Sequence, residues 1–291
     1  ASGNGSSAQQ AVTIRRIKAA LASVGVDDEA SDPLVLPPGL TPQEERELSA
    51  GCYELLLAMA EAWAQPLLGQ SPQSHREKVE WALRLMDRAA NIGCAEHPTI
   101  AFALRRSRYQ NALEQDHDPR VIKHSAATVK ATSTLDHYLL GDEYYKQGQI
   151  DEAAAAFEAV LRSEPRHFWA RYFLALCQLR QGRPELARAH LTACLAQNPD
   201  TSIKPWILLM RGYASGQLAR ASDRSSHLPL MQEAEADFQS ALDALETSDP
   251  STRAEAEYAL FNNRGVMRVQ MERVEEGLAD LRRAIAIDPA Q

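Results

Sequence analysis

Histidine, cysteine and carboxylate side chains are the groups in this sequence that could bind a metal ion or carry out catalysis. None of the eight histidines belongs to an H-E-x-x-H pair, the spacing that places two imidazoles on one helix face as metal ligands. No C-x-x-C motif occurs either, so neither a zinc site nor a disulfide framework is expected. Buried, reduced thiols are expected instead at Cys52, Cys94, Cys177 and Cys194.

Adjacent carboxylates occur where helices are expected to begin or on exposed faces, as at Asp151-Glu152 and Glu275-Glu276. There they favour the helix dipole or solubility rather than acid–base chemistry. The sequence has no G-x-S-x-G nucleophile elbow and none of the glycine-rich, V-A-I-K, H-R-D or D-F-G motifs of protein kinases. It therefore predicts no catalytic residue, metal or cofactor. An enzyme would need a deep pocket of titratable groups near residues 45–130.

The composition narrows the class of partner. The chain has 291 residues, 45% hydrophobic and 24% charged, with a net charge of −8, so it can form a buried core. DNA, RNA and anionic membranes require a basic face, and no basic patch is found. No nucleic-acid or membrane binding is therefore expected. Because the sequence has no signal-peptide pattern, a cytoplasmic protein is predicted.

A repeat organises the middle of the chain. Residues 134–167 read TLDHYLLGDEYYKQGQIDEAAAAFEAVLRSEPRH, and residues 168–201 read FWARYFLALCQLRQGRPELARAHLTACLAQNPDT. The two segments agree where a helical hairpin would be most crowded. The matched residues are Leu140 with Leu174, Gly141 with Ala175, Gly148 with Gly182, Ala153 with Ala187, Phe157 with Leu191, Leu161 with Leu195 and Pro165 with Pro199.

Packing explains why these places recur. Antiparallel helices approach closely only where side chains are small, so the eighth and twentieth places hold glycine or alanine, and the twenty-fourth holds a large residue. The fifteenth-place glycine allows a left-handed turn between the helices, and the thirty-second-place proline ends the second helix. Each segment predicts a pair of antiparallel helices, and the fold class is predicted to be all-α.

Two further copies follow, over residues 202–248 and 249–291. The first of these is roughly ten residues too long for the repeat, and the surplus is expected to form an inserted loop at about 219–230. The small, large and terminating places of the two copies are Gly212, Ala234, Phe238, Ala241, Gly265, Gly277, Leu281, Ala284 and Pro289.

Helical patterns continue upstream, although the repeat fades there. Residues 1–40 are expected to hold a low-complexity start, a short amphipathic helix and a proline-rich linker. Residues 41–133 are expected to form divergent helix pairs of the same kind. Thr41-Pro42-Gln43-Glu44 combines a capping box with proline at the first helical position. The expected helices span 41–65, 74–92, 98–114 and 118–131.

The period and its crowded places resemble the tetratricopeptide-repeat (TPR) superfamily. That resemblance implies a right-handed superhelical solenoid of antiparallel helix pairs. Stretches over roughly 43–291, including LDHYLLGDEYYKQG and NNRGVMRVQMERVEEGLADLRRAIAIDP, also resemble the TPR region of planctomycete-type bacterial serine/threonine protein kinases. In that family the TPR region follows a kinase domain. The resemblance therefore implies a signalling role in which this region recruits proteins to a kinase.

In the TPR family, the second, fifth, ninth, twelfth and thirteenth places point into a concave groove that holds a protein or peptide. A heat-shock carboxylate clamp would need lysine and asparagine where Tyr138 and Asp142 stand, so that ligand is not expected. Some of the aromatic residues could instead pack between adjacent repeats. The groove residues implied by the resemblance are Leu135, Tyr138, Asp142, Tyr145, Lys146, Trp169, Tyr172, Leu176, Leu179, Arg180, Asn262 and Val266.

The two ends of the chain lead to a further expectation. The sequence begins with Ala1, and no polar capping helix follows the fourth copy, although solenoids normally cap that apolar face. We therefore expect the chain to be part of a longer protein, or to cover its last repeat by binding a partner or a second copy. A free-standing TPR adaptor or assembly factor is the alternative to a kinase-associated region.

Overall fold

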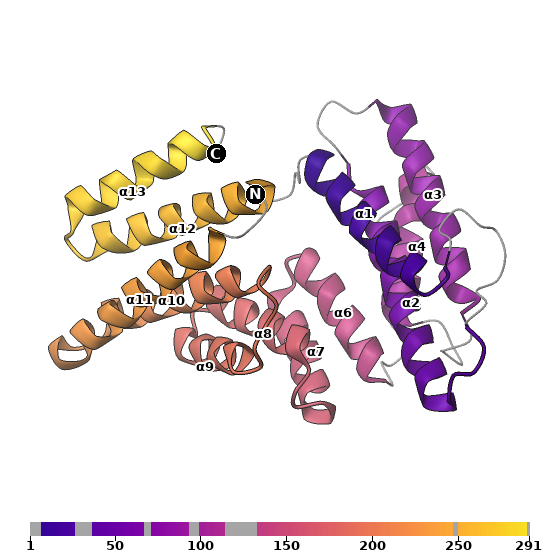
Figure 1. Ribbon diagram of the computed structural model, residues 1–291, viewed down its shortest axis with the longest axis horizontal. Coiled ribbons are helices and arrows are strands. Elements are labelled where there is room, and N and C mark those ends of the chain that lie inside the picture. The colour runs from indigo at the N-terminus through magenta and orange to yellow at the C-terminus, as the bar shows by residue number, and fades with distance from the viewer. Residues whose placement is uncertain are drawn as a thin grey trace. The chain divides into compact units, whose positions relative to one another are not determined.

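The computed structural model describes residues 7–26, 37–66, 71–92, 99–113, 133–246 and 250–289. Within these ranges the regular secondary structure consists of twelve α-helices without strands, which confirms the predicted all-α class (Figure 1). The chain divides into two compact units, residues 1–132 and 133–291. The helix predicted at 118–131 and the predicted buried thiol of Cys94 lie outside the described residues.

The first unit contains α1 (Ser7–Ser23), α2 (Pro42–Ala64), α3 (Pro72–Ala90) and α4 (Ile100–Leu113). Each helix packs on the next in chain order. The Tyr53 hydroxyl and the Thr99 Oγ1 are 2.8 Å apart, and Thr99 also accepts a hydrogen bond from the backbone N–H of Phe102 in the first turn of α4. The beginning of α4 is therefore fixed to the middle of α2.

The helix starts follow their caps. Thr41 and Glu44 form the predicted capping box, in which the Thr41 backbone N–H donates to the Glu44 carboxylate at 2.8 Å. The start predicted for α3 at Ser74 is wrong by three residues. The Ser71 hydroxyl accepts from the Ser74 N–H, and Pro72 occupies the first turn, where the missing N–H costs no hydrogen bond.

The second unit is built from four antiparallel helix pairs. The first helices of consecutive pairs contact one another, and the second helix of each pair contacts the first helix of the next. Successive pairs therefore stack in chain order (Figure 1). The pairs are α6 (Thr134–Lys146) with α7 (Ile150–Ser163), α8 (Phe168–Arg180) with α9 (Pro184–Leu195), α10 (Lys204–Ala221) with α11 (Arg224–Leu245), and α12 (Pro250–Gln270) with α13 (Val274–Ile287).

Small residues lie where the helices of a pair approach most closely. A Cβ added to Gly141 would be 2.7 Å from the Phe157 ring, and one added to Gly265 would be 2.9 Å from Leu281 Cγ. Gly148 and Gly182 adopt positive φ angles of 76° and 70° in the turns, which side chains with a Cβ disfavour. The buried residues among the predicted packing places include Ala153, Phe157, Ala175, Ala187, Leu191, Ala234, Phe238, Ala241 and Ala284.

The third pair has no inserted loop, contrary to the expectation for residues 219–230. Only Ser222 and Asp223 separate α10 from α11, because the surplus residues lengthen the helices to 18 and 22 residues, against 13 and 12 in α8 and α9. In the added turns, Ala219 is buried and Leu230 is partly buried against the same hydrophobic cluster. These apolar side chains extend the hydrophobic contact between the two helices, so the surplus is structured.

Candidate functional site

An aromatic cluster lies on α6 and α8, which contact each other. Phe173 stands at its centre, with ring centroids 5.6 Å from Tyr145, 6.3 Å from Trp169 and 5.5 Å from Tyr172. Beneath it, Phe173 stacks on the buried Phe157 ring of α7 at 5.7 Å. These rings support one another through the offset and tilted arrangements that aromatic pairs prefer.

Exposure separates the members of the cluster. At 44%, Trp169 is the most exposed of the phenylalanine, tryptophan and tyrosine residues within the described ranges, whereas Tyr172 is only 8% exposed. Tyr172 therefore contributes mainly to packing between repeats, and burial raises its pKa above the ordinary value. Trp169 presents an apolar surface to solvent from a helix that its neighbours hold in place.

Arg180 and Lys146 have different environments although both end a first helix. The Arg180 guanidinium lies 4.4 Å from the centroid of the Tyr145 ring, a cation–π contact, and its side chain is exposed. Burial raises the pKa of Tyr145, while Arg180 partly opposes that shift. Lys146 Nζ is 2.7 Å from Asp142 one turn earlier, so part of its charge is already compensated.

The other residues predicted for the groove divide between two places. Leu135, Leu176 and Leu179 are partly buried on α6 and α8. Asn262 and Val266 lie on α12, which α10 separates from α8 in the stacking order. The structure thus brings together the aromatic residues of the first two pairs, and Asn262 and Val266 belong to a separate region.

Two members of the cluster were missed by the sequence interpretation. Phe173 occupies the sixth place of its repeat, which the resemblance does not assign to the groove. His167 precedes α8, where its Nδ1 accepts a hydrogen bond from the Ala170 N–H at 3.1 Å and its ring lies 5.0 Å from Tyr138. The run of apolar and aromatic residues in HFWARYF is the signal that could have identified both.

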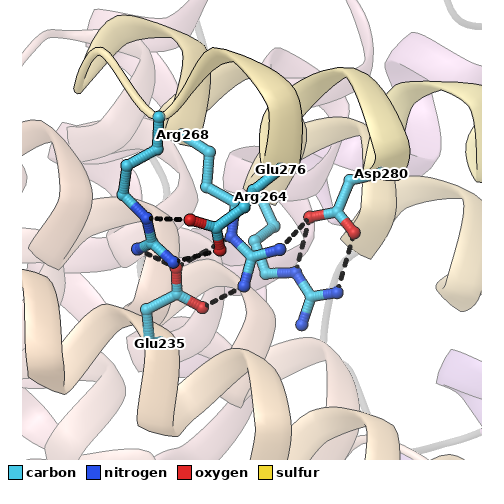
Figure 2. Close-up of polar contacts among 6 residues, drawn as sticks. Glu235, Arg264, Arg268, Glu276 and Asp280 are labelled. Carbon is cyan, nitrogen blue, oxygen red and sulfur yellow. Dashed lines mark hydrogen bonds and ion pairs between the residues drawn. The ribbon is translucent and has the colours of Figure 1, made fainter.

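An ionic network joins the last two pairs (Figure 2). Arg264 on α12 makes a bidentate contact with Asp280 on α13, at 2.8 and 2.9 Å. Arg268 bridges that Asp280, at 2.8 Å, to Glu235 on α11, which it contacts at 2.9 and 2.7 Å. Arg273 extends the network from Glu235 to Glu276.

The charges of this network balance one another, which indicates a role in stability rather than in ligand binding. Three arginines face three carboxylates, and the innermost pair, Arg264 and Asp280, has side chains only 8% and 4% exposed. Although burial alone would raise it, the pKa of Glu235 is lowered by the hydrogen bond from Arg268 and by the neighbouring arginines. Because every charge in the network has a partner, little capacity remains for a ligand. The contacts instead hold α12 and α13 against α11.

The described residues offer little for catalysis. No group of three or more histidine, cysteine or carboxylate side chains that could hold a metal ion occurs in them. Burial raises the pKa of the Cys177 thiol to about 12 and of Cys194 to about 11, and it also raises that of Cys52. These three thiols are buried and free of disulfides, so they are poor nucleophiles.

A hollow of about 430 Å³ lies between α1 and α2 in the first unit. Most of its lining is apolar, and its carboxylates are Glu44 and Glu47 of α2. Hydrogen bonds from Thr41 lower the pKa of Glu44, as befits a helix cap. In the ranges that the structure describes, no helix is long and apolar enough to cross a membrane.

Comparisons with known proteins agree with this architecture. Residues 138–201 match the family model described as "Tetratricopeptide repeat". A solved structure of a monomeric IFIT1 mutant with m7Gppp-AAAA is similar with a TM-score of 0.53 and 12% sequence identity, over 97% of this chain and 65% of that chain. This chain therefore spans about two thirds of IFIT1 in that structure. No curated protein matches it in sequence. Residues 138–201 thus match tetratricopeptide repeats, and the fold of the chain is that of an all-α TPR solenoid.

Proposed function

We propose that this chain is a protein-interaction scaffold that binds a segment of a partner protein on the aromatic cluster of α6 and α8. The exposed indole of Trp169 is the observation that carries the proposal. Tryptophan, tyrosine and arginine are the residues that most often dominate the binding energy of protein interfaces. Here Trp169 is held by Phe173 and Tyr172, and Arg180 is held over Tyr145. A partner would therefore meet a preorganised surface.

The chemistry of the cluster indicates the kind of segment it would bind. An apolar or aromatic side chain of the partner would pack on Trp169, and an acidic side chain would pair with Arg180. IFIT1 was solved with m7Gppp-AAAA, but the net charge of −8 in this chain favours a protein ligand over RNA.

We propose further that this region serves a larger serine/threonine kinase, recruiting substrates or regulators to it. The resemblance of residues 43–291 to kinase-associated TPR regions supports this role. A free-standing adaptor or assembly factor with no attached enzyme is the alternative. Determining whether the parent gene encodes kinase motifs before Ala1 distinguishes the two, and their absence would contradict the kinase association.

Site-specific photo-crosslinking in the source cell tests the binding surface. A photo-reactive residue at position 169 should crosslink to a partner protein, whereas one at Leu186, which is 48% exposed on α9, should not. The crosslinked segment would then be synthesised and titrated, and Trp169→Ala and Tyr145→Ala with Arg180→Ala should each weaken binding without altering helicity. A partner captured only at position 186, or equal affinity of all variants for the segment, would contradict the proposed site.

A further inference from the structure

Helix α13 carries an apolar stripe that its own unit covers only in part, because Leu281 packs toward Gly265 of α12 while the other members are exposed. Val274, Leu278 and Ile285 are 48%, 42% and 62% exposed, and the partly buried Leu281 lies between the last two along the helix. The spacing of these four residues is four, three and four. That is the spacing of the apolar seam in a two-helix coiled coil, where such residues pack layer by layer against a second helix.

The charges beside the stripe indicate which helix would cover it. Exposed Glu275 and Arg282 lie seven residues apart on the same flank of the seam, two helical turns along one face. The opposite flank is formed by Gly277 and Ala284, which are buried against α12. The accessible edge of the seam is thus acidic toward the start of α13 and basic toward its end.

We propose that α13 pairs with α13 of a second copy of this chain in antiparallel orientation. In that arrangement Val274 of each copy faces Ile285 of the other, and Leu278 faces Leu281. Equivalent flanks face each other in an antiparallel pair, so Glu275 of each copy meets Arg282 of the second copy. The surface is therefore complementary to itself, as a two-fold dimer interface must be.

A parallel pair lacks this complementarity. There the flank with Glu275 and Arg282 would face the opposite flank of the second helix, where Gly277 and Ala284 offer no charge. Two other charged residues of α13 have partners in their own copy, because Glu276 pairs with Arg273 and the Arg283 guanidinium lies 5.2 Å from the Phe261 ring. Glu275 and Arg282 therefore select the antiparallel orientation.

This interface goes beyond the proposed function and uses a different surface. The aromatic cluster lies on α6 and α8, in the first two pairs, whereas the seam lies on α13 in the fourth. Self-association would therefore join two binding surfaces in one particle and would raise the avidity for a partner with two binding segments.

Analytical ultracentrifugation of the full chain over a concentration series tests the dimer. The wild-type chain should show a reversible monomer–dimer equilibrium, and Leu278→Glu should abolish it. Leu186→Glu places the same charge on an exposed leucine of α9 and should leave the equilibrium unchanged, with circular dichroism checking that both variants are folded. A wild-type monomer at every concentration, or a dimer that survives in Leu278→Glu, overturns the proposal.

Charge reversal and disulfide trapping test the orientation. Glu275→Arg and Arg282→Glu should each raise the dimer Kd, and the double variant should restore it. An equimolar mixture of Glu275→Cys and Arg282→Cys should form an intermolecular disulfide under oxidation, whereas neither variant should do so alone. Crosslinking of either variant to itself, or failure of the double reversal to restore the dimer, overturns the antiparallel arrangement.

Discussion

In the first two helix pairs of the repeat unit and in the last two, the two helices of a pair approach closely at the same places, but different side chains flank that approach. At the seventh and twenty-third places, the first pair has Leu140 and Ala156 and the second has Leu174 and His190. The third and fourth pairs instead place Arg211 opposite Asp237 and Arg264 opposite Asp280, both in bidentate contact. The adjoining eighth place is glycine or alanine in all four pairs.

The joints between repeats differ in the same way. Aromatic rings join the first pair to the second, through Tyr145 with Phe173 and Phe157 with Phe173. Arginine–carboxylate contacts join the third to the fourth, through Arg268 and Glu235. Paired ions need a defined geometry, whereas rings tolerate more displacement. The repeat therefore specifies where helices meet, and the chemistry at each joint can be exchanged.

The largest effect is expected from breaking the ionic joint. Asp280→Ala leaves Arg264, which is 8% exposed, without its carboxylate, and loss of one member of a buried pair should cost about 3–5 kcal/mol of unfolding free energy. Glu276→Ala, at the exposed end of the same network, is the matched control and should change stability little. Urea unfolding measures both, and equal effects would show that burial does not govern the network.

A smaller loss is expected from crowding the contact in the first pair. Gly141→Ala places a methyl group against the Phe157 ring and should cost about 1–3 kcal/mol through overpacking. Gly51→Ala, on α2 with open space around it, should raise stability slightly because alanine favours the helix. Thermal unfolding tests the pair of variants. If Gly141→Ala has the same unfolding temperature as the wild type, the Phe157 ring moves aside without loss of stability, which contradicts the prediction.

Exchanging the ionic side-chain pair of the third repeat for the apolar pair of the first should change the free energy of unfolding still less. Arg211→Leu with Asp237→Ala gives the third pair the residues of the first. Replacing even a buried ion pair with apolar residues is often close to neutral, and this pair is only partly buried. Asp237→Ala alone should be clearly less stable than the double variant, because Arg211 then loses its carboxylate partner. A double variant as unstable as the single one would mean that the third pair requires the ionic contact.

The smallest effect is the pH dependence of stability that His167 contributes in the aromatic half. Burial, which outweighs the opposing charge of Glu164, lowers the pKa of His167 below its ordinary value of 6.5. Because the folded state favours the neutral ring, the stabilising contribution present above that value is lost as the pH falls through the lowered pKa. His167→Asn keeps a capping side chain that does not titrate and should reduce the loss, as measured by unfolding between neutral and acidic pH.

Regular spacing made much of this architecture predictable from sequence. The 34-residue period located Gly141, Phe157 and their equivalents, because close helix packing demands small and large side chains at fixed intervals. The period could not show that residues 219–230 continue α10 and α11, since a length rule treats any surplus as a loop. Leu218 and Met231 lie on the core side of these helices, and their spacing from the neighbouring core residues was a helical signal in the sequence.

The ionic joints were missed for a different reason. Their signal is an arginine directly before the small residue and an aspartate directly before the large one, as in Arg264-Gly265 and Asp280-Leu281. Charged residues are expected on solvated faces, so the pairing becomes evident only when the third and fourth copies are aligned with each other. The groove list, by contrast, relied on family places and therefore omitted Phe173.

The buried thiols give the molecule built-in reporters of local opening. Cys52 belongs to α2 of the first unit, and Cys177 and Cys194 belong to the second pair of the repeat unit. A labelling reagent can reach each sulfur only when its surroundings transiently separate. Comparing the labelling rates at these positions would show whether the two units open together or independently, without introducing additional cysteines.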